Sequence, residues 1–174
     1  MSRSVRLHRC RVAVAAVALA AVVLSACGDP ASRDRNDATA PVLTMSIAGT
    51  KANPGGIDDV AFGTTTELSP SGAQVLIKAA DDDGVSVVEL WMTEKKQCPG
   101  VVVGPGLAGA PAAKVVGNVT PTEAPSSLVA IFRVDATNRQ VGCTYSFEVW
   151  GEADNAADTP VHAKSPTATV TLKT

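Results

Sequence analysis

The stretch AQVLIKAADDDGVSVVELWM, residues 73–92, holds two apolar runs on either side of a polar turn. In each run, every second side chain is apolar, and most of the polar residues fall on the positions between them. A period of two is the pattern of a β-strand with one face on a core and the other toward solvent. The intervening DDDG favours a tight turn in which Gly84 takes a positive φ and Asp side chains cap backbone amides. The stretch therefore predicts two consecutive strands.

The same alternation recurs through residues 41–174, and no part of that region keeps a helical period over three turns. Short strands at regular spacing, with 14 Gly and 11 Pro as punctuation, predict an all-β sandwich. Between the strands, residues 98–119 read as a long connection with an edge strand at 114–119. We expect that connection to cover an open sheet edge. The predicted strands are 43–47, 73–80, 85–93, 127–135, 143–151 and 166–173.

Two segments carry a resemblance to a known family. AADDDGVSVVELWM (79–92) and YSFEVWGEADNAAD (145–158) are similar to the bacterial immunoglobulin-like and fibronectin-like domains. The resemblance implies an immunoglobulin-like β-sandwich of about seven strands over residues 41–174, used for adhesion, spacing or ligand binding and rarely for catalysis. One extra residue in 151–155, and Ala157-Asp158 in place of the family's Gly-Asn, predict an irregular final hairpin.

The amino-terminal segment reads as an export signal. Four arginines precede a run of 15 nearly all apolar residues, Val12–Ala26, which is short of the roughly 20 needed to span a bilayer. The run ends in Leu24-Ser25-Ala26-Cys27, which resembles the lipobox of bacterial lipoproteins. The resemblance implies cleavage before Cys27 and acylation of that residue, because two or more acyl chains anchor a protein stably. An ordinary signal peptide or a signal anchor is the alternative.

These features divide the chain into a discarded signal peptide (1–26), a lipidated Cys27 with a flexible tether (27–40) and one domain (41–174). Removal of residues 1–26 takes away four arginines and changes the formal charge from −2 to −6. An acidic body argues against a nucleic-acid binder. The expected location is the extracytoplasmic face of the cell membrane, with the membrane as a partner through the lipid.

After processing, Cys98 and Cys143 are the remaining cysteines. In the family's architecture, residues 85–93 and 143–151 form neighbouring antiparallel strands, so the end of the first lies beside the start of the second. The resemblance thus implies a disulfide between Cys98 and Cys143 in an oxidising compartment. Two free thiols or half of a metal site are the alternatives.

Trp91 and Trp150 fall on the outward register of those same two strands, beside Glu89 and Glu148. Exposed aromatic groups of this kind commonly mark interaction surfaces, and they also form stacking platforms for sugars. We therefore expect a ligand-binding surface for a protein or a glycan. Two alternatives stay open: residues 98–119 fold over both rings, or the register is shifted by one and the rings lie in the core.

Acidic residues suggest two further functions. Asp81, Asp83 and Asp154 lie in two turns that, if they share one pole of the sandwich, would suit a calcium-binding accessory or adhesion domain; a solvated turn with capping Asp side chains explains them without a metal. Glu89 and Glu148 would be the carboxylates of an envelope hydrolase, but a flat sheet face supplies no cleft. We expect a non-catalytic module without a cofactor.

Overall fold

The computed structural model describes residues 38–103, 111–117, 124–137 and 139–174. Within these ranges the chain is all-β, as predicted, and no helix is long and apolar enough to cross a membrane. The predicted signal peptide (1–26), Cys27 and most of the tether lie outside the described residues.

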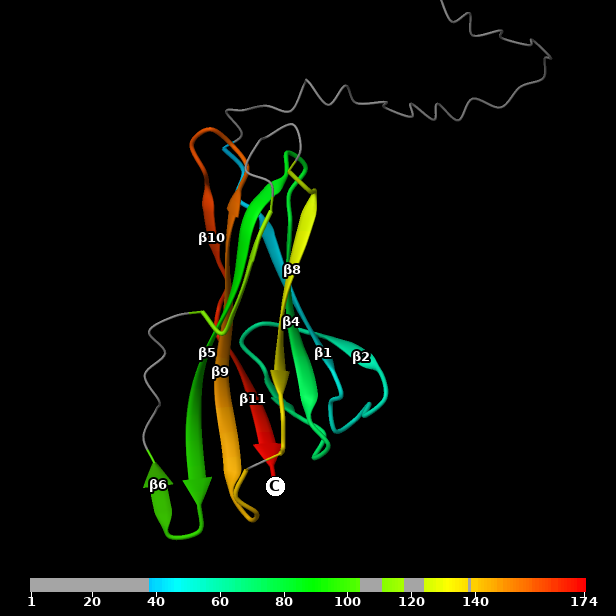
Figure 1. Ribbon diagram of the computed structural model, residues 1–174, viewed down its shortest axis with the longest axis vertical. Helices are drawn as coiled ribbons and strands as arrows, with labels where there is room; N and C mark the ends of the chain where they lie inside the picture. Colours follow the sequence, from blue (N-terminus) through cyan, green and yellow to red (C-terminus); the bar gives the residue numbers. More distant parts are fainter. Residues whose placement is uncertain (1–37, 104–110, 118–123, 138) are drawn as a thin grey trace, which may run out of the picture.

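The strands form two layers (Figure 1). The first sheet has the order β2-β1-β4-β8 and is antiparallel throughout. Its strands are β1 (Val42–Ala48), β2 (Ile57–Val60), β4 (Ala73–Ala80) and β8 (Ser127–Val134).

The second sheet has the order β3-β11-β9-β5-β6, with β10 paired to β9 and β7 paired to β5. The long central strands β5 and β9 run antiparallel and give this sheet most of its length. Its strands are β3 (Thr65–Glu67), β5 (Val85–Cys98), β6 (Val101–Val103), β7 (Ala113–Val116), β9 (Thr144–Asn155), β10 (His162–Lys164) and β11 (Ala168–Lys173).

The core lies between the two layers and follows the predicted alternation. Val75 and Ile77 of β4 face Leu90 of β5 and Phe147 and Val149 of β9, and all five are fully buried. Burial of such side chains stabilises the fold by about 1.5–3 kcal/mol each. The next inward position of β9 is Gly151, where an added Cβ would lie 2.6 Å from Cγ2 of Ile77. A glycine there lets the two sheets approach closely.

Every strand predicted from the sequence is present, but the bounds differ. β4 coincides with the predicted 73–80, whereas β5 extends to Cys98 and β9 to Asn155. Both extensions exist because β5 and β9 continue to pair with each other beyond the apolar runs. The short strands β2, β3, β6 and β10 were not predicted, because three or four residues give no readable period.

The 98–119 connection lies along the edge of the second sheet. Its described parts form β6, paired with Lys96–Cys98 of β5, and β7, paired with Val87–Leu90. The edge strand spans Ala113–Val116 and so overlaps the first half of the predicted 114–119. Pairing with β5 covers an edge of the sheet, as expected, rather than the outward face.

The final hairpin is irregular, as the departure from the family pattern predicts. Two strands, β10 and β11, pair with β9 in succession instead of one. Between them, Ser165 turns inward, and its hydroxyl accepts a hydrogen bond of 2.8 Å from the backbone N–H of Gly151. That bond satisfies a buried donor that the interrupted ladder would otherwise leave without a partner.

The turn between β4 and β5 has the predicted chemistry. Gly84 has a φ of 109°, and the side chain of Asp81 accepts a hydrogen bond of 2.9 Å from the backbone N–H of Asp83. The sulfur atoms of Cys98 and Cys143 are bonded, which confirms the predicted disulfide at the other end of β5. The bond joins the last residue of β5 to the residue before β9.

Candidate functional site

Trp91 of β5 and Trp150 of β9 are directly opposite each other in the sheet register. Their chain neighbours Leu90 and Val149 are fully buried, so the two indoles project from the opposite face, away from the core. Both are half-buried. The predicted register is correct, and β6 and β7 lie beside β5 rather than over the rings.

The two indoles are stacked. Their ring centroids are 6.0 Å apart and their planes differ by 8°. Parallel, offset rings at this separation attract each other by about 0.5–1.5 kcal/mol beyond the area they bury. The pair therefore forms one aromatic unit that spans the two central strands.

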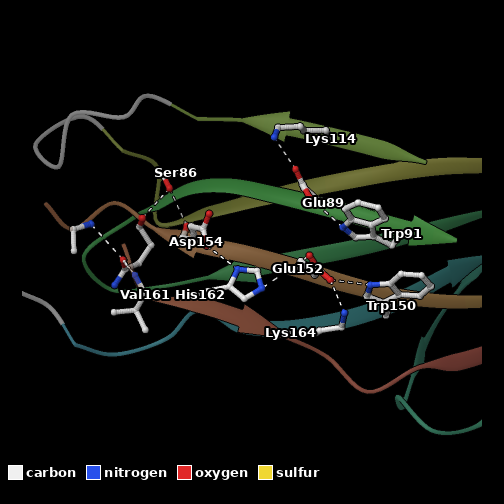
Figure 2. A network of polar contacts seen from close by, with 12 residues as sticks. Ser86, Glu89, Trp91, Lys114, Trp150, Glu152, Asp154, Val161, His162 and Lys164 are labelled. Atoms are coloured by element: carbon white, nitrogen blue, oxygen red, sulfur yellow. Dashed lines mark hydrogen bonds and ion pairs between the residues drawn. The ribbon is translucent and has the colours of Figure 1, made fainter. Parts of the chain in front are cut away.

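A carboxylate holds each indole by its N–H group (Figure 2). Nε1 of Trp91 donates to Oε2 of Glu89, and Nε1 of Trp150 donates to Oε1 of Glu152, each over 3.0 Å. Because Glu89 and Glu152 are themselves register partners, both N–H groups point in the same direction along the sheet. These bonds to charged acceptors restrict the rotation of the two rings.

Two lysines balance the two carboxylates. Lys114 of β7 binds Glu89 at 2.6 Å, and Lys164 of β10 binds Glu152 at 2.8 Å. The register aligns the four side chains in one row across four strands, in the order Lys114, Glu89, Glu152, Lys164. Carboxylates directly opposite each other repel, and a lysine on each side offsets that repulsion. We call these four residues, together with Trp91 and Trp150, the tryptophan face.

Electrostatics within the tryptophan face favour the ionised form of Glu152. Burial opposes ionisation of Glu152, whose side chain is only 18% exposed, but the hydrogen bonds from Lys164 and Trp150 outweigh burial and lower its pKa. Nζ of Lys164 also lies 5.4 Å from the ring centroid of Trp150, within the range of a cation–π contact.

Glu152 also borders a histidine. Nδ1 of His162 lies 2.8 Å from Oδ1 of Asp154, and Nε2 of the same ring lies 4.0 Å from Oε2 of Glu152. His162 and Asp154 extend the polar network shown in Figure 2 toward the end of β9.

Of the two acids predicted beside the tryptophans, Glu89 contacts an indole and Glu148 does not. Glu148 lies on the same outward face, but it binds Lys95 at 2.5 Å and accepts a hydrogen bond from Thr93. The bond from Lys95 is the main cause of its lowered pKa, and burial opposes it. The acid that contacts Trp150 is Glu152, two residues along β9 in the other direction.

Sequence reasoning did not identify Glu152, Lys114 or Lys164. Glu152 shares the outward register of Trp150, and this shared register was the one feature of the sequence that could have identified Glu152. The two lysines come from β7 and β10, and their positions opposite the acids depend on strand pairings that a single sequence does not reveal.

The acidic residues considered for calcium are engaged separately. Asp81 is buried and accepts from the backbone of Asp83, while Asp154 contacts His162. Within the described ranges, no three His, Cys, Asp or Glu side chains form a group that could hold a metal ion. Asp81, Asp83 and Asp154 therefore do not form such a group.

Comparison with known proteins gives no family assignment: this chain matches no protein-family model, no curated protein and no solved structure.

Proposed function

We propose that this protein is a lipid-anchored protein of the cell envelope whose β-sandwich is a non-catalytic binding module. The ligand contacts the tryptophan face, and the stacked pair of Trp91 and Trp150 is the observation that carries this proposal. Tryptophan provides much contact area with few rotatable bonds, which is why it is enriched among the residues that dominate binding.

The rigidity of the tryptophan face supports a binding role. Glu89 and Glu152 hold the indole N–H groups, and the two lysines hold those acids in turn. A surface that is already fixed loses little side-chain entropy when a ligand binds. Ordered side chains of this kind are what a recognition surface requires.

The state of the acids supports a non-catalytic module. A retaining glycosidase needs one carboxyl group with a raised pKa to serve as general acid. The pKa values of Glu148 and Glu152 are instead lowered by ion pairs and hydrogen bonds. Glu152, paired with Lys164, therefore does not suit the role of a proton donor, and Glu89 is already bound by Lys114 and the indole N–H of Trp91.

The anchor rests on the amino-terminal sequence and is supported by the disulfide. A bond between Cys98 and Cys143 is typical of a protein outside the cytoplasm. The chain enters the domain where the side-chain amide of the buried Asn155 donates to the carbonyl of Thr39. The tether expected from the sequence, residues 28–40, would connect the lipid on Cys27 to the domain over roughly 20 Å.

Membrane fractionation tests the anchor. The wild-type protein should be in the membrane fraction and should incorporate a labelled fatty acid. Cys27→Ala should abolish the label and either release the protein or leave the precursor uncut. A processed Cys27→Ala protein that stays in the membrane would refute lipidation.

Fluorescence quenching tests the binding surface separately, on the domain that begins after Cys27. The chain has two tryptophans, so Trp91→Phe and Trp150→Phe each leave one reporter. Acrylamide should quench both reporters in the folded protein, because both rings are half-buried on the outward face. Two inaccessible tryptophans would refute the tryptophan face as a ligand-contacting surface.

A further inference from the structure

We propose that the ligand of the tryptophan face is an uncharged glycan, and that one sugar ring stacks on the outer face of Trp91 beside Glu89 and Lys114. This inference rests on the proposed function, since it names the class of ligand for the same surface.

The tryptophan face is nearly symmetric about the line between β5 and β9. On each side, a lysine binds a glutamate, and that glutamate binds an indole whose inner face stacks on the other indole. Each indole therefore has one remaining face, directed away from its partner.

The two remaining ring faces differ. Nζ of Lys164 lies over the ring of Trp150, 5.4 Å from its centroid. Among the described residues, no cation and no second aromatic ring occupies the outer face of Trp91, and we assign the ligand to that face.

The charges beside Trp91 favour an uncharged ligand. Glu89 already has Lys114 at 2.6 Å and the indole N–H at 3.0 Å, and its side chain is only 16% exposed. A cationic ligand would compete with Lys114 for Glu89, and an anionic ligand would compete with Glu89 for Lys114. An anion that drew Lys114 away would leave the partly buried carboxylate of Glu89 without its partner, which is costly, whereas a cation would gain little from a carboxylate that Lys114 already neutralises.

A pyranose ring can contact both the indole of Trp91 and the ion pair of Glu89 and Lys114. Its C–H groups form an apolar, weakly positive face that suits the negative face of an indole. Its hydroxyl groups both donate and accept, so they can bond to the carboxylate and the ammonium together without separating them. An uncharged sugar therefore uses the indole and the ion pair at once.

The same charges argue against a second copy of the chain as the occupant. The row reads positive, negative, negative, positive from Lys114 to Lys164. Two such faces related by a two-fold axis along the strands, between β5 and β9, would bring Lys114 against Lys164 and Glu89 against Glu152. Like charges facing each other oppose association.

The test compares oligosaccharides that differ in charge, the first two of which share a backbone. Chitohexaose is uncharged, the chitosan hexamer has the same linkage with free amines, and an oligogalacturonate supplies the anion; maltohexaose supplies a second uncharged linkage. Each is titrated into the released domain, and tryptophan emission and acrylamide quenching are recorded. We expect a saturable change and protection from quenching with an uncharged oligosaccharide, and a response at least about tenfold weaker with both charged ones.

The single-tryptophan variants locate the ligand. In Trp150→Phe the remaining Trp91 should be protected by the bound sugar, whereas in Trp91→Phe the remaining Trp150 should be protected much less and the affinity should fall. Circular dichroism checks that each variant is folded. Ile131→Ala, which removes a side chain 50% exposed on β8 in the other sheet, is the matched control and should bind like wild type.

Three results would overturn the inference. The first is tighter binding of the chitosan hexamer or the oligogalacturonate than of either uncharged oligosaccharide. The second is concentration-dependent dimerisation that Trp91→Phe abolishes, which would make a second copy the occupant. The third is no response to any uncharged oligosaccharide at millimolar concentration while both tryptophans stay accessible to acrylamide. This third result leaves the proposed function standing, whereas inaccessible tryptophans would refute that function itself.

Discussion

The contact between Trp91 and Trp150 can be measured directly with a double-mutant cycle. The two rings stack at 6.0 Å and are register partners, so they form a cross-strand aromatic pair. Replacing each by valine, singly and together, keeps a residue that favours strands at both positions. The cycle then isolates the energy that the two rings share.

The expected coupling free energy is about 0.5–1.5 kcal/mol, the range for aromatic pairs in proteins. Each single substitution also removes an indole hydrogen bond, to Glu89 or to Glu152, and the change at Trp150 removes its contact with Lys164. Those losses recur unchanged in the double variant, so they cancel in the cycle. What remains is the ring–ring interaction.

Urea unfolding followed by far-ultraviolet circular dichroism gives the four free energies of unfolding. The same spectra supply an independent readout, because two parallel indoles in contact produce an exciton couplet that each single variant should lose completely. A control cycle between Trp91 and Ile131, which lie on different sheets, should be additive. Additivity within about 0.3 kcal/mol at Trp91 and Trp150, or a couplet that survives in either single variant, would refute the stacked pair.

Three further variants test the surroundings. Arg139→Lys should destabilise the domain by about 1–2 kcal/mol in urea unfolding, because the planar guanidinium lies 4.4 Å over the ring of Tyr145 and lysine cannot reproduce that stacking. Replacing Cys98 and Cys143 by serine should cost about 4 kcal/mol by the loop-closure estimate, and reductant should lower the Tm of the wild type alone. Glu152→Gln should flatten the fall of Tm with acid: a lowered carboxyl pKa stabilises the fold above the ordinary value of 4.5, and this contribution is lost as the pH falls through the folded-state pKa.

The alternation of side chains was enough to predict the outward placement of the tryptophans. Leu90 and Val149 are apolar and mark the inward register, which leaves their neighbours Trp91 and Trp150 on the other face. The pairing of the two strands followed from the family resemblance, and the disulfide followed from that pairing. These predictions hold because each depends on local period and on the adjacency of two long strands.

The choice between Glu148 and Glu152 could not be made from the sequence. Both lie two residues from Trp150, so both share its outward register. The neighbouring strands decide between them: Lys164 of β10 holds Glu152 beside the indole, and Lys95 of β5 binds Glu148. β10 has three residues, too few to show a period, so its lysine could not be placed in advance.

The arrangement of Glu89 and Glu152 favours a functional origin for the tryptophan face. Two carboxylates in direct register oppose sheet formation, and threonine or valine at both positions would stabilise the strands better. Each acid instead needs a lysine from a short strand, β7 or β10, to offset the repulsion. What the acids achieve together is to fix two indoles in parallel with their N–H groups in one direction. Residues that weaken local stability are expected mainly at functional sites. Here the two acids orient an aromatic pair on the outward face and do not pack in the core.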